Sequence, residues 1–154
     1  MIHSQKHSII TAAVIVLATL LASTANAAQT LDVRDEGQLH YTGSTGSLLR
    51  EEGTATGTLP GQLYVHFVYN GSLTVTAQFT IDGHGWSLTG HGTGTLSSPN
   101  SASPSFRGPL TITGGSGRYS HAYSTGGELF GVFYRRSPKH KYALTVQTLG
   151  ELHY

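Results

Sequence analysis

The side chains able to do chemistry in this chain of 154 residues are few and widely spaced. The chain has no cysteine, which excludes thiol nucleophiles and thiolate metal sites. Seven histidines follow the N-terminal segment described below, namely His40, His66, His84, His91, His121, His140 and His153. No two of them are separated by a single residue, and a zinc site needs three or four converging ligands. The sequence therefore predicts no metal site, and no residue pattern in it indicates a cofactor.

The carboxylates offer a second kind of chemistry, because a buried acid with a raised pKa can act as a general acid or base. Glu51 and Glu52 are adjacent, so only one of them can point inward from a strand. Glu128 follows a glycine-rich segment, and Asp82 lies in an expected turn. An inward Glu51 or Glu52, or else Glu128, is a candidate cavity acid. The simpler interpretation, a solvated strand carboxylate, is the one that we favour for each of them.

A third group of candidates surrounds the glycine-rich turn Gly114-Gly115-Ser116-Gly117. Arg107 and Arg118 flank this turn, and a guanidinium can bind the carboxylate of a ligand through two hydrogen bonds. Together with Glu128 and Tyr119 they form the set of ligand-binding candidates. No catalytic residue can be assigned.

The glycines of this turn have a structural interpretation of their own. Gly114, Gly115 and Gly117 allow positive φ values, or close approach of a neighbouring chain, where a Cβ atom would clash. A phosphate-binding loop would need a helix directly after the glycines, and none is predicted there. We therefore assign these three glycines to backbone geometry.

The elements that carry these residues are strands. Between residues 63 and 96, apolar and polar side chains alternate with a period of two, the pattern of strands with one buried and one wet face. Residues 31–37 are polar and are expected to be an only partly ordered lead-in. The strands are expected at residues 38–42, 48–58, 62–68, 73–81, 86–97, 106–113, 119–124, 128–135 and 142–153, and one core is expected to contain Val65, Phe67, Val75, Phe79, Trp86 and Leu88.

The register of the first hairpin in this region follows from its apolar residues. A two-residue turn at Asn70-Gly71 would place the apolar residues of the two strands on opposite faces. A three-residue loop, Tyr69-Asn70-Gly71, places them on one face instead, with the pairs Phe67–Leu73, Val65–Val75 and Leu63–Ala77. The next turn is expected at Asp82-Gly83 or Gly83-His84, with Phe79 and Ile81 on the same face as Trp86 and Leu88.

Glycines within the strands favour a closed barrel over a sandwich. The inward face carries Gly90, Gly92 and Gly94, which the expected register sets opposite Ala77, Val75 and Leu73. Glycine inside a strand marks a bend or a close approach, and closed barrels need such points. Small residues opposite large ones also fill a tapering interior. The fold class that we predict is all-β, an antiparallel closed β-barrel of about eight strands.

Residues 1–27 have the features of a secretory signal peptide. Lys6 precedes an uncharged apolar run of about 13 residues, and Ala25-Asn26-Ala27 supplies the small residues of a cleavage site. The alternative is an uncleaved anchor, but the run is shorter than the roughly 20 residues of a membrane-spanning helix. We expect cleavage after Ala27, no stable membrane insertion, and residues 28–154 as a single β-barrel domain that is secreted and extracellular.

Charge limits the partners of this domain. Lys6 is the only charged residue among residues 1–27, so the remaining chain has equal numbers of basic and acidic residues. Nucleic acids and anionic membranes are bound through basic patches, so neither is expected as a partner. A small apolar ligand or a second copy of the chain fits a neutral barrel better.

Residues 106–127, FRGPLTITGGSGRYSHAYSTGG, resemble the motif shared by the allene oxide cyclase and dirigent-protein barrels. In that motif a strand ends in a Gly-Gly-Thr-Gly turn, and an aromatic residue, a small residue and a glycine open the next strand. Here the aromatic residue is Tyr119 and the small residue is Ala122, whereas Ser124 stands at the glycine position. The chain is also similar to uncharacterised secreted bacterial proteins, actinobacterial ones especially. The resemblance implies an eight-stranded antiparallel barrel, often trimeric in plants, with an apolar cavity at one mouth.

Three functions are compatible with these features. The first is a secreted non-catalytic barrel that binds a small apolar or phenolic ligand, which the signal peptide and the neutral, threonine-rich exterior support. The second, which only the resemblance implies, is an enzyme-like barrel that steers cyclisation or coupling of a small apolar substrate. The third is a structural extracellular protein. Paired polar groups in a cavity would favour the second function, and an interior filled by Phe67, Phe79, Trp86 and Phe106 would favour the third.

Overall fold

The computed structural model describes residues 28–69, 73–133 and 143–154, and within them eight strands and one short 3-10 helix follow one another along the chain. The strands are β1 (Thr30–Thr45), β2 (Leu48–Gly57), β3 (Gly61–Tyr69), β4 (Thr74–Gly83), β5 (Trp86–Ser97), β6 (Ser105–Ser116), β7 (Tyr123–Phe133) and β8 (Ala143–His153). The helix, η1 (Gly117–Tyr119), lies between β6 and β7. The predicted signal peptide, residues 1–27, lies outside the described residues.

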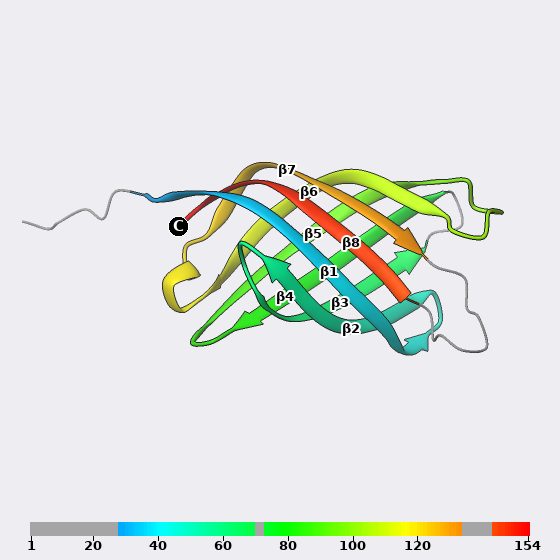
Figure 1. Cartoon of the computed structure of the whole chain (residues 1–154), viewed down its shortest axis with the longest axis horizontal. Coiled ribbons are helices and arrows are strands. Elements are labelled where there is room, and N and C mark those ends of the chain that lie inside the picture. The colour runs from blue at the N-terminus through cyan, green and yellow to red at the C-terminus, as the bar shows by residue number, and fades with distance from the viewer. Residues whose placement is uncertain (1–27, 70–72, 134–142) are drawn as a thin grey trace, which may run out of the picture.

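Each strand pairs with the next in antiparallel fashion, and β8 pairs with β1, so that the sheet closes on itself (Figure 1). The closing ladder is long, since it runs from Thr30 opposite His153 to His40 opposite Ala143. A closed barrel leaves no strand edge open to pairing with another chain. The predicted all-β fold, an antiparallel closed barrel of about eight strands, is confirmed.

The expectation that residues 31–37 are a partly ordered lead-in is wrong, because they form the first half of β1. Their backbone pairs with β8 from Leu31 opposite Leu152 to Gly37 opposite Val146. The inward side of this half-strand carries Asp35 between apolar neighbours, and the outward side is charged. The alternation of apolar residues is therefore too weak here to be recognised in the sequence.

The two strands expected at residues 119–124 and 128–135 form one strand, β7, and the expected start at Tyr119 is wrong. Tyr119 ends η1, and the backbone turns through hydrogen bonds from Ser120 N–H to the Gly117 carbonyl and from Ala122 N–H to the Tyr119 carbonyl. A bulge between Ser124 and Gly127 interrupts the pairing of β7 with β8. Gly126 and Gly127, which stand between the two expected strands, lie in this bulge and at its end. Residues 134–142 lie outside the described residues.

The register expected between β3 and β4 is wrong by four residues. Phe67 pairs with Ala77, Val65 with Phe79 and Leu63 with Ile81. The apolar residues still share a face, because a shift by an even number of residues leaves every side chain on its own side. Leu73, expected opposite Phe67, lies before β4 with a φ of 60° and is 44% exposed. The three-residue loop that we expected includes Asn70 and Gly71, which lie outside the described residues.

The turn between β4 and β5 consists of His84 and Gly85, not of the residue pairs that we expected, because Gly83 pairs with Trp86. Gly85 has a φ of 76°, which explains why a glycine is needed at this position of the turn. Ile81 pairs with Leu88, so the predicted common face of the two strands is confirmed.

The strand glycines of β5 face inward as predicted, but they lie opposite different residues. Gly90 pairs with Phe79, Gly92 with Ala77 and Gly94 with Val75. The register that we expected, which set these glycines opposite Ala77, Val75 and Leu73, is therefore wrong by two residues. A Cβ atom on Gly90 would lie 2.6 Å from Cζ of Phe79. Gly90 therefore makes room for the aromatic ring on the neighbouring strand.

Two clusters of buried side chains fill the interior. The larger one contains Phe67 and Phe106, and the partly buried Phe133 packs against them, with ring centroids 5.2 to 5.9 Å apart. The smaller one contains Tyr119, which packs edge-on against Trp86 at 5.0 Å and against Tyr154 at 4.9 Å. Phe79 and Trp86 contact both clusters, whereas Val65, Phe67 and Val75 belong to the larger cluster and Leu88 to the smaller. The expected single core is thus divided into two parts.

Candidate functional site

A small cavity of about 60 Å³ is lined by members of both clusters, with Val65 and Phe67 from the larger and Leu59 and Leu88 from the smaller. Its wall is almost entirely apolar. Typical sites for drug-sized ligands have volumes of roughly 300–1,000 Å³. The cavity is therefore several times smaller than a site for a drug-sized ligand.

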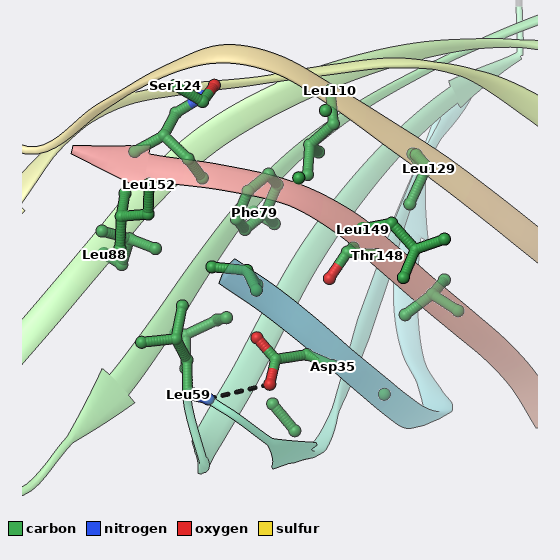
Figure 2. Close-up of a pocket in the computed structure, with 18 of the residues that line it drawn as sticks. Asp35, Leu59, Phe79, Leu88, Leu110, Ser124, Leu129, Thr148, Leu149 and Leu152 are labelled. Atoms are coloured by element: carbon green, nitrogen blue, oxygen red, sulfur yellow. Dashed lines mark hydrogen bonds between the residues drawn. The ribbon is translucent and has the colours of Figure 1, made fainter. Parts of the chain in front are cut away.

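Asp35 is the buried carboxyl in the cavity wall (Figure 2). It is 8% exposed and points inward from β1. Its Oδ1 atom accepts a 2.8 Å hydrogen bond from the Leu59 backbone N–H. Its Oδ2 atom is buried and has no hydrogen-bond partner among the described residues. Burial raises the pKa of Asp35, while backbone hydrogen bonds from Leu59 and Thr58 oppose this rise.

The turn between β2 and β3 brings the Leu59 N–H to Asp35. Gly57 has a φ of 122°, and a Cβ atom there would collide with the Arg34 carbonyl oxygen. Only glycine allows the chain to pass this close to β1. The turn and the carboxyl therefore form one local unit, in which Oδ1 of Asp35 holds the backbone of the turn.

The cavity reaches the surface beside the bulge of β7. There it is lined by Gly126, Gly127 and Gly150, together with the exposed Leu149. Ser124 Oγ accepts a 2.8 Å hydrogen bond from the Ile112 N–H and so links β7 to β6 on the inner side of the bulge. Glycines at this point leave space where other residues would carry side chains.

Glu51 is a second buried carboxyl, at a different level of the barrel. It pairs with Tyr41 on β1 and with Val65 on β3, whereas Asp35 pairs with Gly57. Glu51 is 3% exposed, and its Oε2 atom has no hydrogen-bond partner in the described part of the chain. Burial raises its pKa to about 7. Of the two adjacent glutamates considered from the sequence, Glu51 is therefore the inward one.

Glu128 and Arg107 lie on the outer surface, so Glu128 is the solvated strand carboxylate that we favoured and not a cavity acid. Arg107 donates from Nε to Oε1 of Glu128 and from Nη2 to Oε2, both at 2.6 Å. The two side chains are 68% and 44% exposed, respectively. The hydrogen bond from Arg107 lowers the pKa of Glu128, which stays ionised. The pair bridges β6 and β7 away from the cavity.

Arg118 and Tyr119 close one end of the barrel. Tyr119 is 1% exposed and belongs to the smaller core cluster. The guanidinium carbon of Arg118 lies 4.8 Å from the Tyr119 ring centroid and 5.7 Å from that of Trp86, within the range of cation–π interactions. The four ligand-binding candidates thus form two separate pairs, and neither pair contributes to the lining of the cavity.

The glycine-rich turn has the structural role inferred from its residues. Gly114 and Gly117 have φ values of 153° and 60°. A Cβ atom on Gly115 would collide with the Ser87 carbonyl oxygen on β5. Asp35, by contrast, was missed. Its spacing of two residues from Gly37 and four from Leu39, which also point inward, is the one signal that could have revealed it.

Comparison with protein-family models, with curated proteins and with solved structures finds no match to this chain. Among residues 28–69, 73–133 and 143–154, no three histidine or carboxylate side chains are grouped as metal ligands would be. The described residues also include no helix long and apolar enough to cross a bilayer.

Proposed function

We propose that this protein is a secreted, non-catalytic barrel that binds a small molecule with an apolar body and one hydroxyl group, such as a phenol. The observation that carries this proposal is the Oδ2 atom of Asp35, which is buried in the wall of an apolar cavity without a partner among the described residues. A ligand hydroxyl would supply that partner.

The energetics favour such a ligand over a purely apolar one. A buried polar atom without a hydrogen bond costs roughly 1–3 kcal/mol. A hydroxyl that donates to Asp35 Oδ2 would remove this penalty, while the apolar body would contact Val65, Leu88 and their neighbours. The carboxyl therefore supplies specificity, and the apolar wall supplies affinity.

The size of the cavity limits the ligand. An engineered cavity that binds benzene has a volume of about 150 Å³, compared with about 60 Å³ here. A phenol would therefore have to displace side chains of the cavity wall. We expect weak binding, because this rearrangement opposes association.

The polar side chains of the cavity support a binding role rather than catalysis. Ser124 accepts a hydrogen bond from the β6 backbone, and Asp35 accepts one from Leu59. Within the described residues, no nucleophile in the lining is hydrogen-bonded to a base, which is the arrangement that nucleophilic catalysis uses.

An enzyme-like barrel that steers cyclisation or coupling is the second candidate. It rests on the resemblance of residues 106–127 to allene oxide cyclase and dirigent-protein barrels. The combination of a closed eight-stranded barrel with a buried carboxyl, Asp35, in the wall of an apolar cavity is compatible with it.

A structural extracellular protein is the third candidate. It is favoured by the aromatic side chains that occupy both ends of the interior, Phe67 and Phe106 in one cluster and Trp86 and Tyr119 in the other.

Thermal denaturation with matched ligands tests the proposal. 4-Methylphenol and toluene share an apolar body and differ in one hydroxyl group. The difference between the shifts that they cause in the midpoint of thermal unfolding therefore isolates the contribution of a hydroxyl bound to Asp35. A ligand that binds only the folded protein raises the midpoint. We expect 4-methylphenol to raise it more than toluene does, and we expect Asp35→Ala to abolish this difference.

The matched control is Glu128→Ala, which removes a carboxyl from the outer surface and should leave the difference intact. Failure of every apolar and phenolic compound to shift the midpoint would exclude the two ligand-based functions and leave the structural one. A steady turnover of such a compound by the wild-type protein, absent in Asp35→Ala, would favour the enzyme-like barrel.

A further inference from the structure

The outer face of the barrel carries a second hollow, separate from the interior cavity. Its volume is about 310 Å³, and its lining comes from β3, β4, β5 and β6. The first three of these strands contribute the side chains on which the following argument depends, namely Tyr64, His66, Gln78, Thr80, Thr89 and His91. We call this hollow the sheet-face groove.

The register of the sheet arranges these side chains in two rows. His66, Gln78 and His91 lie opposite one another across β3, β4 and β5, and the adjacent row consists of Tyr64, Thr80 and Thr89. These strands are neighbours in the barrel wall (Figure 1). Neighbouring strands are about 4.8 Å apart and alternate residues about 7 Å apart, so the two rows cover roughly 10 Å by 7 Å. This is the footprint of one or two sugar rings.

Most of the polar groups in the sheet-face groove are available to a ligand. The Thr89 hydroxyl donates to the Gly114 carbonyl, and the Thr113 hydroxyl donates to the Thr89 carbonyl. Among the described residues, the side chains of Tyr64, His66 and Gln78 make no hydrogen bond to another protein group, nor do those of Thr80 and His91. The groove thus offers hydroxyl, amide and imidazole groups, which can both donate and accept.

The lining of the sheet-face groove contains no Asp, Glu, Lys or Arg side chain. The nearest charged residues in the two rows are on β2, where Arg50 pairs with His66 and Glu52 with Tyr64. These charges have opposite signs and lie at one edge. A neutral ligand rich in hydroxyl groups matches such a lining better than an anion or a cation does.

From these observations we propose that the sheet-face groove binds a neutral glycan. The ring of Tyr64, which is 38% exposed, offers an aromatic surface to the apolar face of a sugar ring. Gln78 and the histidines on either side of it hydrogen-bond the hydroxyl groups at the rim of that sugar. The inference does not depend on the interior cavity, because the two linings share only Phe79 and the polar side chains invoked here lie on the outer face of the sheet.

Titration of the full secreted protein with neutral hexasaccharides tests this inference. The probes are hexamers of glucose, xylose, mannose and N-acetylglucosamine, with an oligogalacturonate as the charged comparison, and the readout is isothermal titration calorimetry. We expect at least one neutral hexamer to bind and the charged one not to bind. Tyr64→Ala should weaken that binding about tenfold or more, which corresponds to about 1.4 kcal/mol.

Gln78→Ala is the second variant, and it should also weaken binding, because it removes the amide at the centre of one row. Tyr123→Ala is the matched control, since Tyr123 is also an exposed tyrosine but lies outside the groove on β7. Thermal denaturation of each variant establishes that it is folded. Failure of every neutral hexamer to bind would overturn the proposal, and so would binding that Tyr64→Ala and Gln78→Ala leave unchanged. Binding of the oligogalacturonate alone would also overturn it.

Discussion

Glu51→Gln tests the structure most directly, because it replaces a buried acid by a neutral side chain of nearly the same shape. Glu51 is 3% exposed, and its Oε2 atom has no partner among the described residues. Glutamine resembles the protonated carboxyl. The variant should therefore be about as stable as the wild type at low pH and more stable at high pH.

The magnitude follows from the pKa of Glu51, which burial raises from 4.5 to about 7. Between these two values the unfolded chain has released the proton while the folded protein still holds it. The free energy of unfolding thus falls as pH rises through this window, by about 1.4 kcal/mol for each pH unit. The stability contributed by the protonated Glu51 is complete below pH 4.5 and is lost above pH 7. The free energy of unfolding falls across this window by a total of about 3 kcal/mol.

Urea denaturation of the wild type and of Glu51→Gln at a series of pH values between 4 and 8.5 measures this effect. We expect the difference between the two proteins to grow from near zero to about 3 kcal/mol in favour of the variant. Because Asp35 is present in both proteins, its own titration cancels in the difference. Glu52→Gln is the control, since Glu52 lies on the outer face of the same strand. A difference that stays constant with pH would refute the burial of an ionisable Glu51.

Three further measurements test the packing of the core and the expected removal of residues 1–27. Phe79→Ala should lower the free energy of unfolding by about 3–5 kcal/mol, because the ring contacts both core clusters; a loss below about 1 kcal/mol in urea denaturation would contradict this packing. Gly90→Ala should cost about 1–3 kcal/mol, since a Cβ atom there would lie 2.5 Å from the Thr111 carbonyl oxygen and 2.6 Å from Phe79 Cζ. An unchanged melting temperature would argue against that close contact. Intact-mass measurement of exported protein should give a chain that begins at Ala28, and a mass that includes Met1 would exclude cleavage.

Alternation of side chains along the strands was sufficient to predict an all-β fold and the buried face of each strand between residues 63 and 96, and the strand glycines favoured a closed barrel over a sandwich. This information is local, since successive side chains in a strand point to opposite faces whatever the partner strand is. It could not set the register. Phe67 keeps its inward orientation opposite either Leu73 or Ala77, so alternation alone could not distinguish the expected pairing from the observed one with Ala77.

The candidate site was less predictable than the fold. Charged and aromatic residues around the glycine-rich turn drew attention to Arg107 and Glu128, which pair with each other on the surface. Glu51 was correctly among the candidate acids, but its sequence neighbour Glu52 was equally eligible. Asp35 was overlooked, because its flanking charges made residues 31–37 resemble a solvated segment.

Closure of the barrel is what turned Asp35 into a cavity residue. Its strand pairs with β8, which is more than a hundred residues away in the chain, and the turn at Gly57 brings the Leu59 N–H to its carboxyl. Whether a carboxyl is solvated or buried depends on what the rest of the chain places around it. The periodicity of the chain therefore determines which side of a strand a residue occupies, while contacts between distant strands decide whether that side is a packed core, a cavity or a surface groove.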